Sequence, residues 1–339
     1  MKLQSDSITE LPKLCAPNLE YMNLSDCGEL VTVHELCAPN LVKLILYRCY
    51  KLVTVHESVG SLDRLEYWLL EHCVSLQNLP KNLRLKSLVD FYLDNCSKLE
   101  KFPNILHQEM KCLKGLSFSC SGIREVPSSI GYLTQLTRLW LDGCHNLRDL
   151  PDSIGYLTQL TLLWLGGCHN LRDLPDSIGY LTQLTHLRLD GCHNLRDLPD
   201  SIYKLQMLEH FSFDSAKLRP PCNSFDGLPG YGFPRLWKLE FSGCGNKLEF
   251  LMKPNYFPVL DVLDLSGTDI VSIPESLNRF TTLQTLDICN CQQLRQILGL
   301  PQSIKFLNAS HCRSLDAQSS SRLFNQVSLF QVIIIKKIK

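Results

Sequence analysis

The stretch "LTQLTRLWLDGCHNLRDLPDSIGY", residues 133–156, is repeated almost letter for letter at 157–180 and again at 181–204. The third copy ends in Tyr-Lys instead of Gly-Tyr. Otherwise the copies differ only at three positions, which are occupied by Arg138/Leu162/His186, Trp140/Trp164/Arg188 and Asp142/Gly166/Asp190. These positions alternate with leucines that do not change. The pattern predicts a repetitive fold in which one face varies while the rest is held constant.

The same unit runs through nearly the whole chain in the form L-x-x-L-x-L-x-x-C-x-x-L-x-x-L-P, followed by a stretch often written x-S-I-G-x-L. Its first leucine, or an equivalent isoleucine, occurs thirteen times between Leu19 and Ile304. Most occurrences are 22–25 residues apart, and one gap of 28 coincides with the Pro- and Gly-rich residues 214–235. We interpret that gap as a loop insertion in an otherwise regular stack of repeats.

Within each unit the L-x-L segment alternates with a period of two, which predicts a short strand with leucine on one face. One strand per unit favours a stack of parallel strands. The proline after the last apolar position excludes a continued helix there, and the S-I-G-x-L connector predicts an irregular or short helical opposite side. The expected fold is therefore an α/β leucine-rich-repeat solenoid, a horseshoe with a parallel concave sheet of about 13 coils.

The repeat pattern also predicts the domain organisation. Residues 1–18 form an N-terminal lead-in, residues 19–318 form the solenoid with the loop insertion near 214–235, and residues 319–339 form a C-terminal tail. The tail ends in "VSLFQVIIIKKIK", which is consistent either with a truncated end or with an added edge strand.

Ten of the sixteen cysteines occupy one position of the repeat: Cys27, Cys49, Cys73, Cys96, Cys144, Cys168, Cys192, Cys244, Cys291 and Cys312. We expect this side chain to turn inward after the strand, where it packs as a small apolar group and donates a weak S–H hydrogen bond. A metal array is disfavoured because the "CHN" triplets lack C-x-x-C or H-x-x-x-H spacing. Disulfides between neighbouring coils are disfavoured because parallel, in-register side chains rarely meet disulfide geometry.

Composition and motifs argue against several functional classes. Lys plus Arg and Asp plus Glu are equal at 34 each, so the net charge offers no basic footprint for nucleic acid. The start of the chain is too polar for a signal peptide, and no apolar run is long enough to span a membrane. Phosphate-loop, nucleophile-elbow and zinc-helix motifs are missing, and His34 and His56 lack a second histidine at ligand spacing. We expect a soluble protein with no catalytic site, cofactor or metal.

The residues resemble a known family. The cysteine after L-x-x-L-x-L, the connector "LPDSIGYLTQL", "LEKFPNI" at residues 99–105 and the ending "LPQSIKFLNASHCRSLDAQSSS" are similar to plant intracellular immune receptors. Specifically, they resemble the leucine-rich-repeat region of the Toll/interleukin-1-receptor-type nucleotide-binding class, over roughly residues 11–321. In that family this region recognises pathogen effectors and restrains a nucleotide-binding switch. The family's signalling and nucleotide-binding domains have no counterpart in this sequence, so their activities are not carried over.

The resemblance implies a disease-resistance module in the cytoplasm, with the nucleus or a membrane surface reached through partners. Its partner would be a pathogen effector, or the nucleotide-binding and signalling domains of a full-length receptor. Two other classes stay open. An intracellular scaffold for small GTPases or ubiquitin-ligase substrates shares the L-P-x-x-I-x-x-L connector but usually has Asn at the Cys position. An extracellular repeat receptor favours the same Asn and carries a signal peptide.

The variable positions predict the binding surface. A period of two places them on the strand face opposite the leucines, which is the concave face of the sheet. Large aromatic and Arg side chains there are of the kind enriched at binding hot spots, although they would also serve merely to cover the sheet. The candidate binding residues are Tyr21, Tyr47, Tyr67, Tyr92, Arg138, Trp140, Asp142, Leu162, Trp164, His186, Arg188, Asp190 and His210.

The missing phosphate loop predicts that this chain alone binds neither ADP nor ATP. Titration of each nucleotide into the chain in a calorimeter should release no binding heat. A site of micromolar affinity for either nucleotide would contradict the assignment of the chain as a recognition module without a switch of its own.

Overall fold

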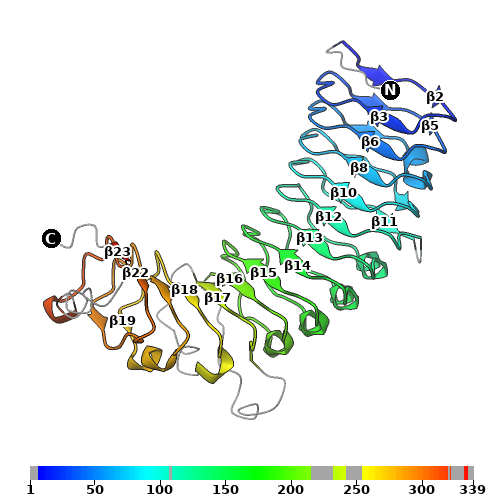
Figure 1. Ribbon diagram of the computed structural model, residues 1–339. Helices are drawn as coiled ribbons and strands as arrows, with labels where there is room; N and C mark the ends of the chain where they lie inside the picture. Colours follow the sequence, from blue (N-terminus) through cyan, green and yellow to red (C-terminus); the bar gives the residue numbers. More distant parts are fainter. Residues whose placement is uncertain are drawn as a thin grey trace. The chain divides into compact units, whose positions relative to one another are not determined.

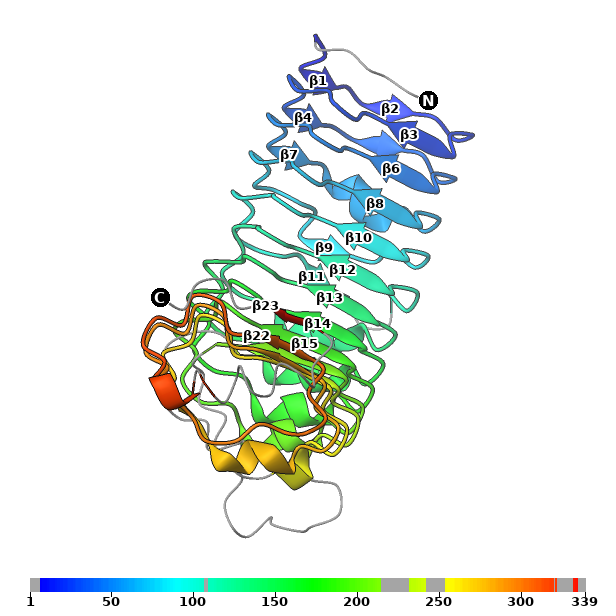
Figure 2. The same cartoon turned by 60° about the vertical axis from the view of Figure 1, so that its left-hand side comes forward.

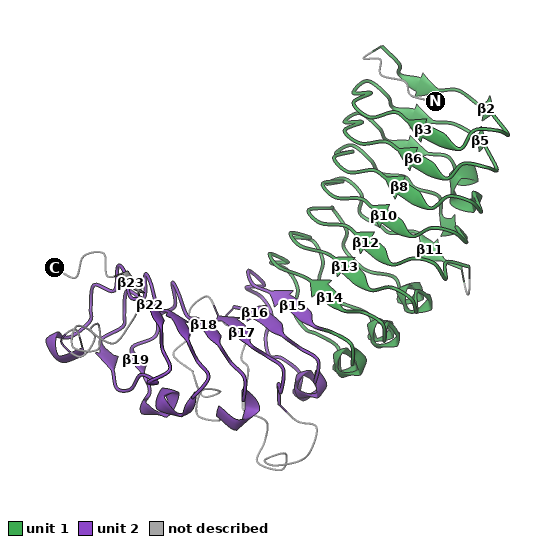
Figure 3. Cartoon of the chain, in the orientation of Figure 1, with its two compact units in different colours: residues 1–184 green, residues 185–339 purple. Residues whose placement is uncertain are grey.

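The structure is a computed structural model that describes residues 7–106, 109–214, 232–241, 254–319 and 321, together with the backbone of 332–334. The chain divides into two compact units, Met1–Leu184 and Thr185–Lys339, which Figure 3 shows in different colours. Each unit is a stack of coils with one main-sheet strand per coil (Figure 1). All thirteen predicted strands are present, seven in the first unit and six in the second, so the leucine-rich-repeat solenoid is confirmed.

The main sheet of the first unit is parallel and follows the chain order. Its strands are β3 (Tyr21–Asn23), β6 (Lys43–Ile45), β8 (Tyr67–Leu69), β10 (Asp90–Tyr92), β12 (Gly115–Ser117), β13 (Arg138–Trp140) and β14 (Leu162–Trp164). Neighbouring strands are in register, so that Leu139 of β13 aligns with Leu163 of β14. Both leucines are fully buried, as are Leu141 and Leu165. The predicted inward register of the leucines is therefore correct.

Shorter ladders lie elsewhere in the first unit. They are β1 (Glu10–Leu11), β4 (Thr32–Val33) and β7 (Thr54–Val55); β2 (Leu14–Cys15) and β5 (Leu36–Cys37); and β9 (Asn82–Leu83) and β11 (Asn104–Ile105). Figure 2 shows β1, β4 and β7 in a row of their own, apart from β3, β6 and β8. Because β1 and β2 fall within residues 1–18, stacking begins inside the stretch that the sequence predicts to be a lead-in. A strand of two residues is too short to show an alternating pattern of apolar and polar residues, so the sequence could not predict these strands.

The main sheet of the second unit has the same parallel order. Its strands are β15 (His186–Leu189), β16 (His210–Phe213), β17 (Lys238–Phe241), β18 (Val262–Asp264), β20 (Thr285–Asp287), β22 (Phe306–Asn308) and β23 (Val332–Ile334), with β19 (Ser272–Ile273) and β21 (Gln296–Ile297) as a separate pair. β23 lies in the predicted tail and pairs in parallel with β22, which agrees with the edge-strand interpretation. Of the predicted loop insertion, residues 215–231 lie outside the described residues, and so does Cys244.

The side of the coils opposite the main sheet carries 3-10 helices of three to five residues. They are η1 (Glu57–Ser61), η2 (Ser128–Tyr132), η3 (Asp152–Tyr156) and η4 (Asp176–Tyr180) in the first unit, and η5 (Asp200–Lys204), η8 (Pro254–Tyr256) and η9 (Glu275–Arg279) in the second. Among the described residues, α-helix is limited to one turn that includes 317–319. The connectors between proline and leucine hold only about one turn, a length at which the tighter 3-10 helix is common.

The glycine of the S-I-G connector in the first two copies is explained by the packing of neighbouring 3-10 helices. A Cβ atom on Gly155 would lie 2.7 Å from the Cβ of Ser177 and 2.7 Å from its carbonyl oxygen. The third copy replaces this glycine with Tyr203, which is 2% exposed. The Tyr203 ring packs against Phe233 at 5.2 Å and Tyr256 at 5.7 Å between ring centroids. The replacement of glycine by Tyr203 is therefore a packing change, whereas Lys204, which stands where the other copies have an exposed tyrosine, is itself exposed.

A left-handed residue stands immediately before the repeated cysteine, a feature that the sequence analysis did not predict. In the three copies it is Gly143, Gly167 and Gly191, and in other coils Asp26, Arg48, His72, Asn95, Asn290 and His311. In several other coils the N–H of this residue donates to a backbone carbonyl of the next coil, as from Gly143 to Gly166 at 2.7 Å, whereas the N–H of Gly191 donates to the Asp214 carboxylate at 2.6 Å. Asn, Asp and Gly tolerate this backbone conformation best, and the dipeptides G-C, N-C and D-C are its sequence signal.

The repeated cysteines form a ladder that links the coils. The Sγ atoms of Cys49, Cys73, Cys96, Cys144, Cys168, Cys291 and Cys312 each donate to the carbonyl of an apolar residue one coil earlier, at 2.9–3.3 Å. Burial raises the pKa of Cys96 to about 12 and of Cys144 to about 11, which keeps these thiols protonated as donors. In two coils that lack the cysteine, the hydroxyls of Ser121 and Thr268 lie beside the next Cys thiol. The predicted inward packing is confirmed for the nine repeated cysteines that the structure describes.

Because each coil buries its leucines against neighbouring coils, the substitution Leu163→Ala should reduce the free energy of unfolding by about 2–5 kcal/mol. Chemical denaturation of wild type and variant measures the difference. A loss below about 0.5 kcal/mol, the range of surface substitutions, would contradict the burial of Leu163.

Candidate functional site

The candidate site is the outward side of each main sheet, here called the sheet face. It consists of the two outward residues of every main-sheet strand and the residue two positions beyond, such as Arg138, Trp140 and Asp142 in the β13 coil. In β13 and β14 the central leucine is buried while the residues on either side are half-buried. All thirteen candidate binding residues lie on the sheet faces of the two units and are half-buried, except that Tyr21 is 41% exposed.

An aromatic cluster lies on the sheet face of the first unit. The ring of Trp140 makes edge-to-face contacts with Tyr92 at 6.0 Å and with Trp164 at 6.4 Å. Tyr92 reaches Trp140 across the intervening strand β12, where Ser117 is small and buried. The other predicted aromatic residues make separate contacts. Lys43 lies over the ring of Tyr67, and the ring of Tyr47 meets His72.

Gly115 makes room for an ion pair that spans β12. The Nη2 atom of Arg138 lies 3.1 Å from Oδ1 of Asp90, which is two strands and 48 residues away. A Cβ atom on Gly115 would lie 3.2 Å from that Nη2 and 3.3 Å from the hydroxyl of Tyr92, and would overlap the Asp90 carboxylate. The guanidinium carbon of Arg138 also lies 5.5 Å from the ring centre of Trp140. Because Gly115 has no side chain, Asp90 and Arg138 can form an ion pair across β12. Arg138 also contacts Trp140 and so connects this ion pair to the aromatic cluster.

Two carboxylates on the same face of the first unit, Glu71 and Asp94, follow the neighbouring strands β8 and β10. Burial raises the pKa of both side chains. Asp94 accepts hydrogen bonds from the Ser117 hydroxyl and, at 2.8 Å, from the Ser119 N–H. These two acids, together with Asp90, Gly115 and Ser117, were not among the residues predicted from the sequence, although they stand at the same alternating positions on the sheet face.

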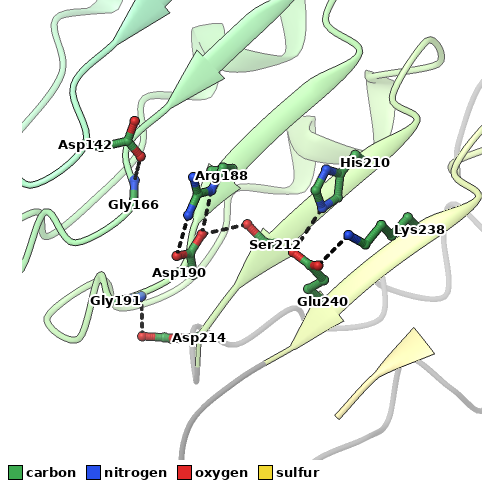
Figure 4. Close-up of polar contacts among 10 residues, drawn as sticks. All are labelled: Asp142, Gly166, Arg188, Asp190, Gly191, His210, Ser212, Asp214, Lys238 and Glu240. Atoms are coloured by element: carbon green, nitrogen blue, oxygen red, sulfur yellow. Dashed lines mark hydrogen bonds and ion pairs between the residues drawn. The ribbon is translucent and has the colours of Figure 1, made fainter. Parts of the chain in front are cut away.

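The sheet face of the second unit is a polar network (Figure 4). The Arg188 guanidinium contacts Asp190 through two nitrogens, at 3.1 and 3.0 Å, and the Ser212 hydroxyl donates to the same carboxylate at 2.8 Å. Burial alone would raise the pKa of Asp190, but the hydrogen bonds from Arg188 and Ser212 outweigh it and lower the pKa. Arg188 is therefore held by a carboxylate of its own coil. The second unit thus carries paired charges on its sheet face, where the first unit carries aromatic rings.

A second polar group on this face centres on Glu240. Its carboxylate lies 3.0 Å from Nε2 of His210 and 2.7 Å from Nζ of Lys238 (Figure 4). The hydrogen bond with His210, assisted by Lys238, lowers the pKa of Glu240 to about 2 against the opposing effect of burial. The His186 ring meets His210 edge to face at 5.8 Å, and burial lowers the pKa of His186.

Surfaces outside the sheet face have fewer features suited to binding or catalysis. A recess of about 810 Å³ in the first unit is lined by residues 77–81, 97, 98 and 100–104, none of which belongs to the sheet face. His145 and His169 stack at 4.6 Å between ring centroids, but no group of three or more His, Cys, Asp or Glu side chains suited to a metal occurs in the described part of the chain. In that part of the chain, no helix has the length and apolar character needed to cross a membrane.

Sequence comparison identifies relatives among disease resistance proteins. The family described as "Disease resistance protein RPS4B-like, leucine-rich repeats" matches residues 84–174 and 170–328. The protein SUPPRESSOR OF npr1-1, CONSTITUTIVE 1 of Arabidopsis thaliana is 32% identical over 138 residues, which are 40% of this chain and 8% of that protein. TMV resistance protein N of Nicotiana glutinosa is 33% identical over 139 residues, 40% of this chain and 10% of that protein. The matched segments thus span about a tenth of these relatives.

Solved structures resemble the fold. The Leptospira interrogans leucine-rich-repeat protein LIC12759 aligns with a TM-score of 0.53 at 17% identity, covering 94% of this chain and 96% of that one. A chain of the Toll–Spatzle complex of Drosophila aligns with a TM-score of 0.55 at 15% identity, covering 94% of this chain and 51% of that one. At such low identities these likenesses establish the leucine-rich-repeat fold alone.

The lowered pKa of Glu240 predicts a pH-dependent contribution to stability. A carboxylate whose pKa is lower in the folded state stabilises the fold above its unfolded pKa of about 4.5, and that stabilisation is lost as the pH falls to about 2. Glu240→Gln should therefore cost about 1 kcal/mol or less at pH 7, with the difference from wild type shrinking between pH 5 and pH 2. Thermal unfolding of both proteins, with Asp200→Asn as an exposed control, measures this. A difference that stays constant with pH would contradict the contact.

Proposed function

The chain belongs to the leucine-rich-repeat family of RPS4B-like disease resistance proteins, and from this premise we propose that its sheet face binds a protein partner in plant defence signalling. The observation that carries the proposal is the placement of the substitutions among the three copies. Apart from Tyr203 and Lys204 at the end of the third copy, every substituted position lies on the sheet face. The core leucines and the cysteine turn are unchanged in all three copies, and the 3-10 connector is unchanged in the first two, as expected if the face is where variation is favoured.

The side chains on the first unit's sheet face suit recognition of a protein surface. Tyr92, Trp140 and Trp164 are half-buried rings in mutual contact, so they are held in place before a partner arrives. Rings of this kind contribute a large contact area with little loss of side-chain entropy and are enriched at binding hot spots.

Two kinds of partner are compatible with this surface. One is a pathogen effector, and the other is the nucleotide-binding or signalling domain of a full-length receptor in the cytoplasm. In the second case the sheet face would restrain a switch carried by another part of the receptor. The chain spans only about a tenth of the relatives that it matches, which leaves room in them for such domains.

The substitution pair Trp140→Ala and Trp164→Ala tests the proposal. A partner is first found by screening effectors and the receptor's own domains. The affinity of the variant for this partner should be at least a hundredfold lower than that of the wild type, because both tryptophan rings of the cluster are removed. The matched control is Asp152→Ala with Asp176→Ala, which changes the 3-10 helices of the same two coils. Surface plasmon resonance on both variants, with circular dichroism to verify folding, gives the comparison. Loss of binding in the control alone would assign recognition to the opposite side.

A further inference from the structure

Two exposed cysteines of the first unit lie opposite each other on paired strands. The motif "LCAPNL" occurs at residues 14–19 and again, one coil later, at 36–41. Its cysteines are Cys15 on β2 and Cys37 on β5, which are aligned in the parallel register of these strands. Both are exposed, free thiols. Neighbouring strands lie about 4.7–4.9 Å apart, which falls within the Cα separation of about 4.4–6.8 Å that a disulfide needs.

Contacts on either side of the two cysteines hold the strands in this register. The backbone N–H of Ala16 donates to the carbonyl of Cys37 at 2.9 Å, and Nζ of Lys13 lies 2.7 Å from the carboxylate of Glu35. The thiols also contact each other, because a hydrogen bond with Cys15 and the charge of its thiolate raise the pKa of Cys37. Cys37 therefore stays protonated as the donor, with its sulfur directed at the sulfur of Cys15.

Exposure distinguishes this pair from the repeated cysteines. The thiols of Cys49 and Cys73 are also hydrogen-bonded to each other, but both residues are fully buried and each thiol donates to a backbone carbonyl of the preceding coil. An oxidant in solution cannot reach them, whereas it can reach Cys15 and Cys37. In the described part of the chain no third side chain completes a metal site with the pair, and a structural zinc site takes four ligands. Oxidation is the chemistry that two exposed, adjacent thiols suit.

We propose that Cys15 and Cys37 form a redox-active dithiol, which hydrogen peroxide oxidises to a disulfide between neighbouring coils and which glutathione reduces again. The thiolate of one cysteine attacks an oxygen of peroxide and the O–O bond breaks. The products are a sulfenic acid and hydroxide, which takes up the thiol proton as water. The sulfur of the second cysteine then attacks the sulfenic sulfur, so that the S–S bond forms, the S–O bond breaks and a second water leaves. Two glutathione molecules restore both thiols and become glutathione disulfide.

The disulfide restricts the coil that contains β2. Within the described residues β2 pairs with β5 alone, so it can separate from the stack by breaking one set of contacts. A covalent bond between Cys15 and Cys37 keeps the two strands together in the opened states of this coil. Oxidation therefore tightens one end of the first unit without involving the sheet face, and the inference is independent of the proposed function.

The test treats the reduced, intact chain with an equal molar amount of hydrogen peroxide and then blocks the remaining thiols with N-ethylmaleimide. Mass spectrometry follows digestion with trypsin and a glutamate-specific protease, because trypsin alone leaves both cysteines in one peptide, residues 14–43. The expected product is peptide 14–20 linked to peptide 36–43, lighter by two hydrogen atoms than the two separate thiol peptides together. Glutathione added after the peroxide should restore both thiols.

Serine variants and amide exchange test the pairing and its effect. Cys15→Ser and Cys37→Ser should each abolish the linked peptide. The matched control Cys112→Ser, at another exposed cysteine of the first unit, should leave it unchanged. Oxidation of the wild type should slow hydrogen exchange of the Ala16 amide at least about tenfold, and should have no such effect in Cys15→Ser. Circular dichroism verifies that the variants are folded, as expected for substitutions of exposed side chains.

Three results would overturn the inference. The first is that Cys15 and Cys37 remain free thiols, or become sulfinic or sulfonic acids, without any linked peptide. The second is a disulfide that joins two copies of the chain, seen as a dimer on a non-reducing gel. The third is a linked Cys49–Cys73 peptide formed as readily as the expected one, which would show that exposure does not select the site. The proposed function rests on the sheet face and would stand in all three cases.

Discussion

Each coil of this protein is stabilised almost entirely by its neighbours. A main-sheet strand of three or four residues has no partner within its own coil, so its backbone bonds and its buried leucines are satisfied only by the coils on either side. The repeated cysteines also connect neighbouring coils, because each thiol donates a hydrogen bond to a carbonyl of the preceding coil. The left-handed residue before each cysteine makes the corresponding link to the following coil. These contacts fix nearly every position of the repeat.

Because contacts between coils fix the other positions of the repeat, the outward positions of the strands are where the sequence can change at little cost to stability. Gly155 illustrates the opposite case, since any side chain there would collide with Ser177 of the next coil. At the variable positions the side chains contact other side chains of the sheet face and do not pack into the core. Trp140 contacts Trp164, and Arg188 contacts Asp190. The separation of a constant scaffold from a variable face follows from this geometry, and recognition is the function that such a separation suits best.

Much of this arrangement could be predicted from the sequence. The alternating leucine pattern of one short strand is weak evidence by itself, but it recurs thirteen times along the chain. The inward leucines, the buried cysteines and the thirteen strands were predicted by period and position. The contacts on the face could not be predicted in the same way. The ion pair between Arg138 and Asp90 joins residues 48 apart, and it depends on the missing side chain of Gly115 between them. Periodicity places these three residues on one face, but it does not say which of them pair.

The central claim is that the sheet face is the working surface and that the rest of each coil is scaffold. The most direct measurement is a complete substitution scan of residues 133–184, scored separately for the amount of folded protein and for partner binding. Substitutions that abolish binding without reducing folded protein should cluster at positions 138, 140, 142, 162 and 164, whereas changes at the leucines, cysteines and Gly155 should reduce both. Binding-specific losses concentrated on the 3-10 helices would contradict the account.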